Sequence, residues 1–441
     1  MSGHAVFFNA LPFRRWRNFY FQEEVYMKKL TSASALILAL TLTISACSGN
    51  NAPAATAAAE TTTTAAAETQ QSSASETTAE AVTEAPGTTE NSDTEENYDG
   101  KLVFDHSMEL KYAKCFSVDY YKGGYKVAKL VDDTTMLIVP EGMSVPEEKP
   151  ENAIVLQQPV NNILVSSTPV TSLINSIGAL DSISLTTYDA DSWYIDTVKQ
   201  AILDGKLKYI GDYKEPDYEQ ITASGTTFAF FSTMLTDDVR DQLNNIGVDV
   251  VLDQSAQEDH PLARVEWAKL YGAIFNLEEK AEEVFNVQDK YVEELSKLEN
   301  TGKSVVMFYI TSKGVLYARN ADDYMSKMID LAGGQYALSD VGVGETGTAK
   351  MELEAFYDKA KDADYIIYIW SMGGKPETLD AFVERAAILA DMKAVKEGNV
   401  WCTTPDYFQI QNTIGSMIND IHLMLEADPS TDKLTYLFRL R

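Results

Sequence analysis

The chain has 441 residues, of which 45% are hydrophobic, and its formal net charge is −30 from 66 acidic and 36 basic side chains. The length allows two or three domains at roughly 150 residues each, and the acidic balance argues against a binder of nucleic acid, which needs a basic face. Three cysteines cannot form a disulfide scaffold. Anionic lipid repels a negative chain, so any attachment to a membrane has to come from a feature other than surface charge.

The stretch from Met27 to Cys47 has the organisation of an export signal. Two lysines follow Met27 and precede an apolar run centred on residues 36–44, which is shorter than the roughly 20 residues of a membrane-spanning helix. The letters "ISAC", which end at Cys47, resemble a bacterial lipobox. We therefore expect 27–46 to be a lipoprotein signal peptide and the sulfur of Cys47 to carry a diacylglycerol. The mature protein would then be extracytoplasmic and lipid-anchored to the cell membrane.

Residues 1–26 precede this signal and fit no export pattern. The codons for Gln22, Glu23 and Glu24 can contain a ribosome-binding sequence shortly before the codon for Met27. We therefore expect translation to start at Met27 and 1–26 to be a mis-assigned leader extension.

Residues 48–97 contain no lysine, arginine or aromatic residue and consist mostly of Ala, Thr, Glu and Ser. Such a segment cannot bury enough apolar area to offset the entropy of ordering. The sequence thus predicts a disordered, lipid-anchored tether over 47–97.

The segment 98–156 is predicted to be a small β layer. Short strand-like runs, "LKYAKCFSVDYY", "YKVAKLV" and "TMLIVPEG", are separated by the turn signals Gly123-Gly124 and Asp132-Asp133.

After Pro159 the pattern changes to alternating strands and helices. Apolar runs such as "NILVSS", "TFAFFST" and "VDVVLDQ" alternate with helical stretches such as "TPVTSLINSIGAL" and "DDVRDQLNNIG". This alternation predicts an N-terminal α/β lobe with a parallel sheet over 157–260. A nearly all-helical segment, 261–300, leads to a second alternating set in 301–441. The expected fold is α/β, with two Rossmann-like lobes joined by one long bridging helix, and a cleft between the lobes is the expected ligand site.

Four stretches occur in a specific order: "ILVSSTPVTSLINSIGALDSI", "HPLARVEWAKLYGAIFN", "GVLYARNADDYMSKMIDLAGGQY" and "MKAVKEGNVW". In this order they resemble the iron-complex and cobalamin family of ABC-transporter substrate-binding proteins, over about 161–425. They correspond to its first strand–helix unit, the entry to its bridging helix, its second-lobe signature and its last strand. The β layer at 98–156 departs from the smallest members of that family.

The resemblance implies a protein that is not an enzyme and needs no cofactor. It would capture an iron chelate, siderophore or haem-like, in the inter-lobe cleft and deliver it to the permease and ATPase of an ABC importer. A cobalamin or other corrinoid ligand stays open. An extracellular chelate-modifying enzyme or a sensor ectodomain is the alternative from another class. We expect a monomer that binds no nucleic acid.

In that family one glutamate on each lobe docks into arginine pockets of the permease. Glu219 in "PDYEQI" and Glu354 in "MELEAF" resemble these residues, since each lies at the start of a short helix ahead of an apolar strand. A carboxylate suits an arginine fork. The alternative is that each favours only the dipole of its helix.

Ligand contacts are expected on loops at the carboxyl ends of strands that face the cleft. Aromatic rings and an arginine there suit a chelate with an apolar periphery and anionic oxygens, although core packing is the competing role for each ring. The candidate ligand-binding residues are Ser167, Thr168, Trp193, Tyr194, Thr233, Tyr317, Arg319, Trp370 and Tyr407. Arg319 has an alternative role as an ion-pair partner of Asp322 or Asp323.

No catalytic or metal-binding motif stands out. The chain contains neither a Gly-x-Ser-x-Gly nor an HExxH sequence, so no catalytic residue is assigned. His260 has no partner at ligand spacing, so no metal site is assigned either, and we expect this histidine to cap or pack against the helix that follows it.

Overall fold

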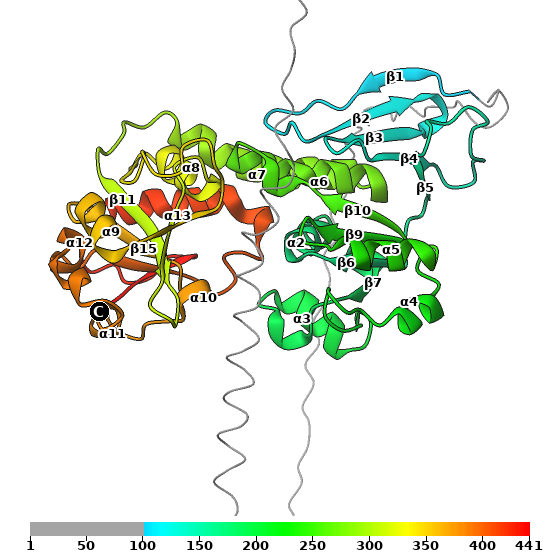
Figure 1. Ribbon diagram of the computed structural model, residues 1–441. Coiled ribbons are helices and arrows are strands. Elements are labelled where there is room, and N and C mark those ends of the chain that lie inside the picture. Colours follow the sequence, from blue (N-terminus) through cyan, green and yellow to red (C-terminus); the bar gives the residue numbers. More distant parts are fainter. Residues whose placement is uncertain (1–100) are drawn as a thin grey trace, which may run out of the picture.

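The computed structural model describes residues 101–441 (Figure 1). The predicted leader extension 1–26, signal peptide 27–46, lipidation residue Cys47 and tether 47–97 lie outside these described residues. Within 101–441, no helix combines the length and the apolar character that crossing a membrane would require.

An N-terminal sheet of five strands forms the predicted β layer. Its strands are β1 (Phe104–Ser107), β2 (Phe116–Tyr121), β3 (Lys126–Leu130), β4 (Thr135–Val139) and β5 (Ile154–Gln157), paired in that order. The first four pair antiparallel, and β5 pairs parallel to β4. Both predicted turns are present, because Gly123 and Asp133 adopt the positive φ angles that tight reversals need.

The first lobe has a five-stranded sheet in which all strands are parallel, as the alternating pattern predicts. Its spatial order is β10-β9-β6-β7-β8. The strands are β6 (Ile163–Ser166), β7 (Ile183–Thr186), β8 (Lys208–Tyr209), β9 (Phe228–Ser232) and β10 (Asp249–Asp253). The helices are α2 (Thr168–Ser176), α3 (Asp196–Leu203), α4 (Tyr218–Ser224) and α5 (Asp237–Asn245), with single turns η4 (Leu180–Ser182), η5 (Ala190–Ser192) and η6 (Ser255–Gln257).

The predicted single bridging helix over 261–300 is wrong, because the segment forms two helices, α6 (Pro261–Phe275) and α7 (Glu278–Leu295). Asn276 ends α6 in the left-handed conformation, which reverses the chain. The helices then pack side by side: a Cβ at Gly272 would stand 2.6 Å from that of Ala281, and Lys269 pairs with Glu282 at 3.0 Å. An antiparallel helical hairpin therefore joins the lobes.

The second lobe holds a mixed sheet in the order β14-β12-β11-β15-β16-β17, and β13 also pairs with β11. Its strands are β11 (Ser304–Ile310), β12 (Leu316–Arg319), β13 (Gln335–Tyr336), β14 (Thr348–Met351), β15 (Tyr365–Tyr368), β16 (Val400–Thr403) and β17 (Leu437–Arg439). Its helices are α8 (Tyr324–Leu331), α9 (Leu353–Ala360), α10 (Trp370–Gly373), α11 (Leu379–Val383), α12 (Lys393–Lys396) and α13 (Ile414–Glu426), with single turns η7 (Ala387–Asp391) and η8 (Gln411–Thr413).

Helix α6 belongs to the cores of both lobes. Leu262 and Val265 pack into the second-lobe core, whereas Trp267 and Tyr271 pack into the core shared by the first lobe and the N-terminal sheet. The residue range 261–274 is buried throughout, including three charged residues. A small shift of α6 would therefore change the packing in both lobes.

Two buried carboxylates fasten the N-terminal sheet to α6, on which it lies in Figure 1. Glu266 accepts hydrogen bonds from the backbone N–H groups of residues 111–113 at 2.7–2.8 Å. Glu258 accepts from the N–H groups of residues 114–115 and from the indole of Trp267. Neither glutamate is more than 2% exposed, so these bonds satisfy charges that would otherwise be costly to bury.

Candidate functional site

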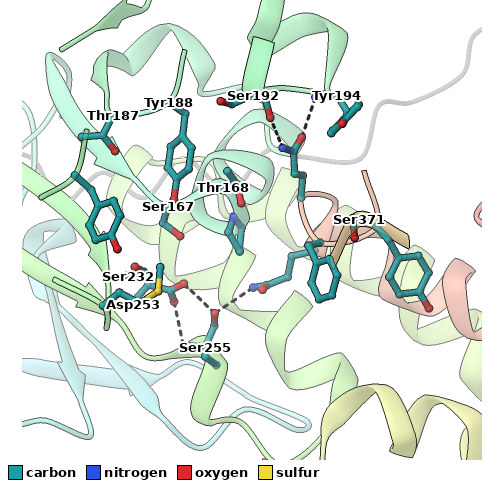
Figure 2. Close-up of a pocket in the computed structure, with 18 of the residues that line it drawn as sticks. Ser167, Thr168, Thr187, Tyr188, Ser192, Tyr194, Ser232, Asp253, Ser255 and Ser371 are labelled. Carbon is teal, nitrogen blue, oxygen red and sulfur yellow. Dashed lines mark hydrogen bonds between the residues drawn. The ribbon is translucent and has the colours of Figure 1, made fainter. Parts of the chain in front are cut away.

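A cavity of about 570 Å³ lies between the lobes. Its volume falls in the range of roughly 300–1,000 Å³ that is usual for sites of small organic ligands. Figure 2 shows Ser167, Thr168, Tyr188 and Asp253 on the first-lobe side and Ser371 on the second-lobe side.

The first-lobe wall is built from the carboxyl ends of its parallel strands. The residues that follow β6, β7, β9 and β10 line the cavity, and Tyr209 at the end of β8 joins them together with Tyr213 and Lys214 after that strand. Loops at this edge of a parallel sheet are the usual ligand-binding position in open α/β folds. The first-lobe lining residues are Ser167, Thr168, Pro169, Thr187, Tyr188, Asp189, Ser192, Tyr194, Tyr209, Asp212, Tyr213, Lys214, Ser232, Thr233, Met234, Asp253, Ser255 and Ala256.

The second-lobe wall comes from the end of β12, from the loop after β16, and from the turn η8 and helices α8, α10 and α13. Arg319 ends β12, and its guanidinium lies 5.3 Å from the ring centroid of Phe408 and 3.9 Å from a carboxylate oxygen of Asp323. Asp323 is one of the two ion-pair partners considered from the sequence. The remaining second-lobe lining residues are Tyr324, Ser371, Met372, Pro405, Tyr407, Gln409, Gln411, Ile414 and Met417.

Arg264 on α6 completes the cavity, and sequence reasoning missed it. Its side chain is 8% exposed, and its guanidinium stacks on the ring of Tyr324 at 3.9 Å. A usable signal was present: Arg264 stands in a helical stretch rich in apolar residues, and a charged side chain on a helix that packs into a core needs a polar or charged partner. The cavity therefore brings two buried guanidinium groups, Arg264 and Arg319, together with several aromatic rings.

Several polar atoms in the wall lack a hydrogen-bond partner within the described part of the chain. They are Nε of Arg264, Oγ of Ser371 and the hydroxyl oxygen of Tyr407. Burial raises the pKa of Tyr407, so its hydroxyl stays protonated and can donate a hydrogen bond. Buried donors without a partner are costly, and a ligand with acceptor oxygens would satisfy them.

The carboxylate of Asp253 also lines the cavity, but it already has partners. Burial raises its pKa, while hydrogen bonds from Ser255 and the charge of Arg264 oppose that rise. The backbone N–H and the hydroxyl of Ser255 donate to its two oxygens at 3.0 and 2.9 Å. Both oxygens of Asp253 are therefore held by Ser255 in the cavity wall near Arg264.

Most of the predicted ligand residues meet in this cavity. Those that line it are Ser167, Thr168, Tyr194, Thr233, Arg319 and Tyr407. The other three do not line it. Trp193 is 1% exposed and packs in the first-lobe core, edge-on to Tyr188 at 5.9 Å. Its polar neighbours in sequence gave the wrong signal, because the loop turns the indole inward.

Tyr317 and Trp370 also lie outside the cavity lining. Tyr317 stacks on Tyr309 at 5.2 Å between neighbouring strands. Trp370 opens α10 and packs against the second-lobe core. In both cases core packing, the competing role considered for each ring, describes the observed position.

His260 is the N-cap of α6, where Nδ1 accepts a hydrogen bond from the backbone N–H of Leu262 at 3.2 Å. Its ring stacks on Tyr112 at 4.1 Å. The expectation that this histidine caps or packs against the helix is confirmed. No group of three or more metal-ligating side chains occurs within 101–441.

Glu219 and Glu354 occupy matching exposed positions in the two lobes. Each is the second residue of its helix, on α4 and α9. Helix α4 leads into β9, which pairs with the lobe's first strand β6; helix α9 leads into β15, which pairs with the lobe's first strand β11. The two glutamates are thus topologically equivalent.

Known proteins are similar to this chain in sequence and in structure. An uncharacterized lipoprotein of Methanocaldococcus jannaschii is 26% identical over 355 residues, which cover 75% of this chain and 84% of the relative. The Bacillus subtilis protein YhfQ, named as an ABC transporter substrate-binding lipoprotein, is 26% identical over 204 residues, 44% of this chain and 60% of its own length. A periplasmic heme binding protein from Pseudomonas aeruginosa is similar in structure, with a TM-score of 0.50, 14% identity, and coverage of 64% of this chain and 98% of that one. This likeness concerns the fold.

The family model described as periplasmic binding protein matches residues 165–407, more than half of the chain. The match includes strands β7 to β16, the helical hairpin and most of the loops that form the cavity. Proteins of this family bind substrates for ABC transporters and are not enzymes. The chain belongs to the periplasmic binding protein family, as a substrate-binding lipoprotein of the ABC-transporter type.

Proposed function

We propose that the protein captures an anionic iron chelate, siderophore or haem-like, in the inter-lobe cavity and delivers it to an ABC importer permease. The observation that carries this proposal is the pair of buried guanidinium groups, Arg264 and Arg319, that line one cavity. Arginines in a desolvated site bind carboxylate or phenolate oxygens through charge-assisted hydrogen bonds. The N-terminal end of α2, which also lines the cavity at Thr168, favours negative charge as well.

The rings around the arginines support a ligand with a flat or apolar body. Tyr188, Tyr213 and Phe408 offer faces and edges for such a body, while the hydroxyl of Tyr407 adds a donor. A corrinoid, whose periphery carries amides rather than carboxylates, makes less use of two guanidinium groups. The name of the Pseudomonas aeruginosa structure, a heme binding protein, is in keeping with an anionic chelate.

Glu219 and Glu354 are the proposed contacts to the permease, and a diacylglycerol on Cys47 is the proposed anchor. The equivalence of the two helices gives the glutamates the matched placement that a two-lobed docking surface needs. Their exposure leaves both carboxylates available to arginine forks. Relatives named as lipoproteins support the anchor.

A thermal-shift series with haemin, a ferric tris-catechol complex and cyanocobalamin tests the ligand class. A ligand that binds only the folded chain raises its midpoint by mass action. We expect a shift with an anionic chelate and none with cyanocobalamin. Arg264→Gln should weaken the binding of that chelate by about tenfold to a hundredfold, the usual effect of a charge-assisted hydrogen bond. Arg240→Gln, outside the cavity lining, is the matched control. A shift with cyanocobalamin alone would favour the corrinoid, and no shift with any probe would contradict the proposal.

A further inference from the structure

A loop of the second lobe crosses the cavity and binds the first lobe. It follows β16 and places Tyr407 and Phe408 in the cavity wall. Next to them, Nε2 of Gln409 donates to the carbonyl oxygen of Ser192 at 2.6 Å, and Oε1 of Gln409 accepts from the backbone N–H of Tyr194 at 2.9 Å. Figure 2 shows both hydrogen bonds at Ser192 and Tyr194. One amide thus joins two backbone groups across the cavity.

Both ends of this connection are fixed within their own lobes. On the first lobe, Asp189 accepts hydrogen bonds from the backbone N–H and the hydroxyl of Ser192 at 2.9 and 2.7 Å, and the buried Trp193 anchors the same loop in the core. On the second lobe, the backbone N–H of Gln409 donates to the backbone carbonyl oxygen of Asp406 at 2.7 Å, and Gln409 is buried. The two hydrogen bonds therefore hold lobe to lobe and do not merely tie down a flexible loop.

Other inter-lobe hydrogen bonds of this loop lie deeper, beside α6 and α2. The amide of Gln411 donates to the carbonyl oxygen of Arg264 at 2.9 Å, and the hydroxyl of Ser172 donates to Asn412 at 2.6 Å. Ser172 and Arg264 are buried, whereas Tyr194 is 44% exposed. Because α6 is shared by both cores, a rotation of the lobes about it would separate the Gln409 contacts to the 192–194 loop before the Gln411 contact to α6 itself.

We infer that Gln409 is the latch of this cavity, the residue whose two hydrogen bonds to Ser192 and Tyr194 set how often the lobes separate and a ligand can enter or leave. The inference rests on the proposed function in that it treats the cavity as the ligand site. Tyr407 and Phe408 immediately precede Gln409 in sequence. A ligand that contacts their rings would therefore also favour the closed arrangement of the lobes. A ligand that favours their closed position shifts the lobes toward the closed state.

The frequency of opening can be measured without any ligand. Ser371→Cys places a thiol where the buried Oγ of Ser371 lines the cavity, and Cys47→Ala removes the cysteine outside the described residues. The native thiols of Cys115 and Cys402 are buried, so an aromatic disulfide reagent reports mainly on the new one. In this background of the full chain, Gln409→Ala removes both latch bonds. Gln409→Glu keeps the acceptor for Tyr194 and loses the donor to Ser192.

Gln409→Ala should raise the rate of thiol modification about tenfold, since each net hydrogen bond changes an equilibrium by a factor of roughly two to ten. Gln409→Glu should give an increase as well. Gln200→Ala, which removes an exposed glutamine bonded to Asp204 within the first lobe, should leave the rate unchanged. Equal rates in Gln409→Ala and its parent, with both chains folded by circular dichroism, would overturn the latch. An equal increase in Gln200→Ala would also overturn it, because the effect would then be general loosening.

The assay separates this inference from the proposed function. If haemin and the ferric catechol complex fail to bind, the proposed ligand class is wrong, yet the modification rates still decide whether Gln409 controls opening. If haemin binds, its dissociation from Gln409→Ala should be about tenfold faster than from the unsubstituted chain, for the same reason. Unchanged dissociation would count against the latch.

Discussion

Arg264 and Glu266 stand two residues apart on α6 and face opposite sides of that helix. Arg264 lines the cavity between the lobes, and Glu266 accepts hydrogen bonds from backbone N–H groups of the segment that connects β1 to β2 in the N-terminal sheet. Two residues of an α-helix turn through about 200°, so these side chains point apart. The N-terminal sheet therefore packs behind the inter-lobe cavity, on the same helix that supplies one of the two arginines in the cavity lining.

Glu266→Gln should lower the free energy of unfolding by about 2–3 kcal/mol, because hydrogen bonds to a charged group are worth roughly 1.5–3 kcal/mol and the new NH₂ group would face a donor. Urea denaturation of both chains measures the difference. Glu283→Gln on the exposed side of α7 is the matched control and should leave the midpoint unchanged. Equal midpoints for Glu266→Gln and the unsubstituted chain would show that the buried carboxylate does not fasten the sheet.

Trp193→Ala should destabilise the fold, whereas Tyr194→Ala should act mainly on the ligand. The buried indole of Trp193 fills the first-lobe core, and large-to-small changes of this kind cost about 3–5 kcal/mol. Tyr194 is half exposed and lines the cavity. Denaturant midpoints and haemin affinities of the two variants separate these roles. A stable Trp193→Ala protein that no longer binds haemin would restore the sequence-based assignment of Trp193 as a ligand contact.

The stability of the protein should fall as the pH is lowered through the titration of His260. Burial and the positive charge of Lys327 lower the pKa of His260 below its ordinary value of 6.5. Asp289 and Glu266 raise it, and Lys114 lowers it further. Because the folded-state pKa is depressed, the unfolded chain binds more protons in this range. The stabilisation is present above 6.5 and is lost as the pH falls through the folded-state pKa.

His260→Asn separates this titration from others, because asparagine keeps an N-cap acceptor and does not titrate. Above the ordinary histidine pKa, the difference in free energy of unfolding between the unsubstituted chain and His260→Asn should be constant. Below that pKa, the unsubstituted chain should lose stability relative to His260→Asn. Guanidinium denaturation between about pH 5 and pH 8 measures this. A difference that does not vary with pH would mean that the folded-state pKa of His260 is not depressed.

Glu219→Ala combined with Glu354→Ala should abolish uptake and leave the affinity for the ligand intact, because the exposed carboxylates lie outside the cavity lining. Uptake of the chelate by whole cells and haemin titration of the isolated protein are the two measurements. The control pair Glu215→Ala and Glu352→Ala removes exposed carboxylates a few residues away and should leave uptake unchanged. Undiminished uptake in the first pair would refute the docking role.

Local patterns predict much of the fold because they reflect local causes. The alternation of apolar runs with amphipathic stretches specifies the parallel sheet of the first lobe, and His260 before Pro261 specifies a helix start. The break at Asn276 was missed, since the helical spacing of apolar residues continues across it and asparagine is only a moderate helix breaker. The reversal at Asn276 is accompanied by close packing of Gly272 against Ala281, a contact between the two helices that spacing within either one does not reveal.

By itself the sequence determines the two-lobed α/β class and the edge of each sheet that faces the cavity, because strand direction and loop position follow from periodicity along the chain. Ser167, Thr233 and Arg319 are accordingly placed in the cavity. Only the tertiary structure decides that Trp193 turns into the core, that Arg264 reaches the cavity from α6, and that Gln409 bonds to the opposite lobe. These outcomes depend on which distant segments meet, and packing and the satisfaction of buried polar groups select them.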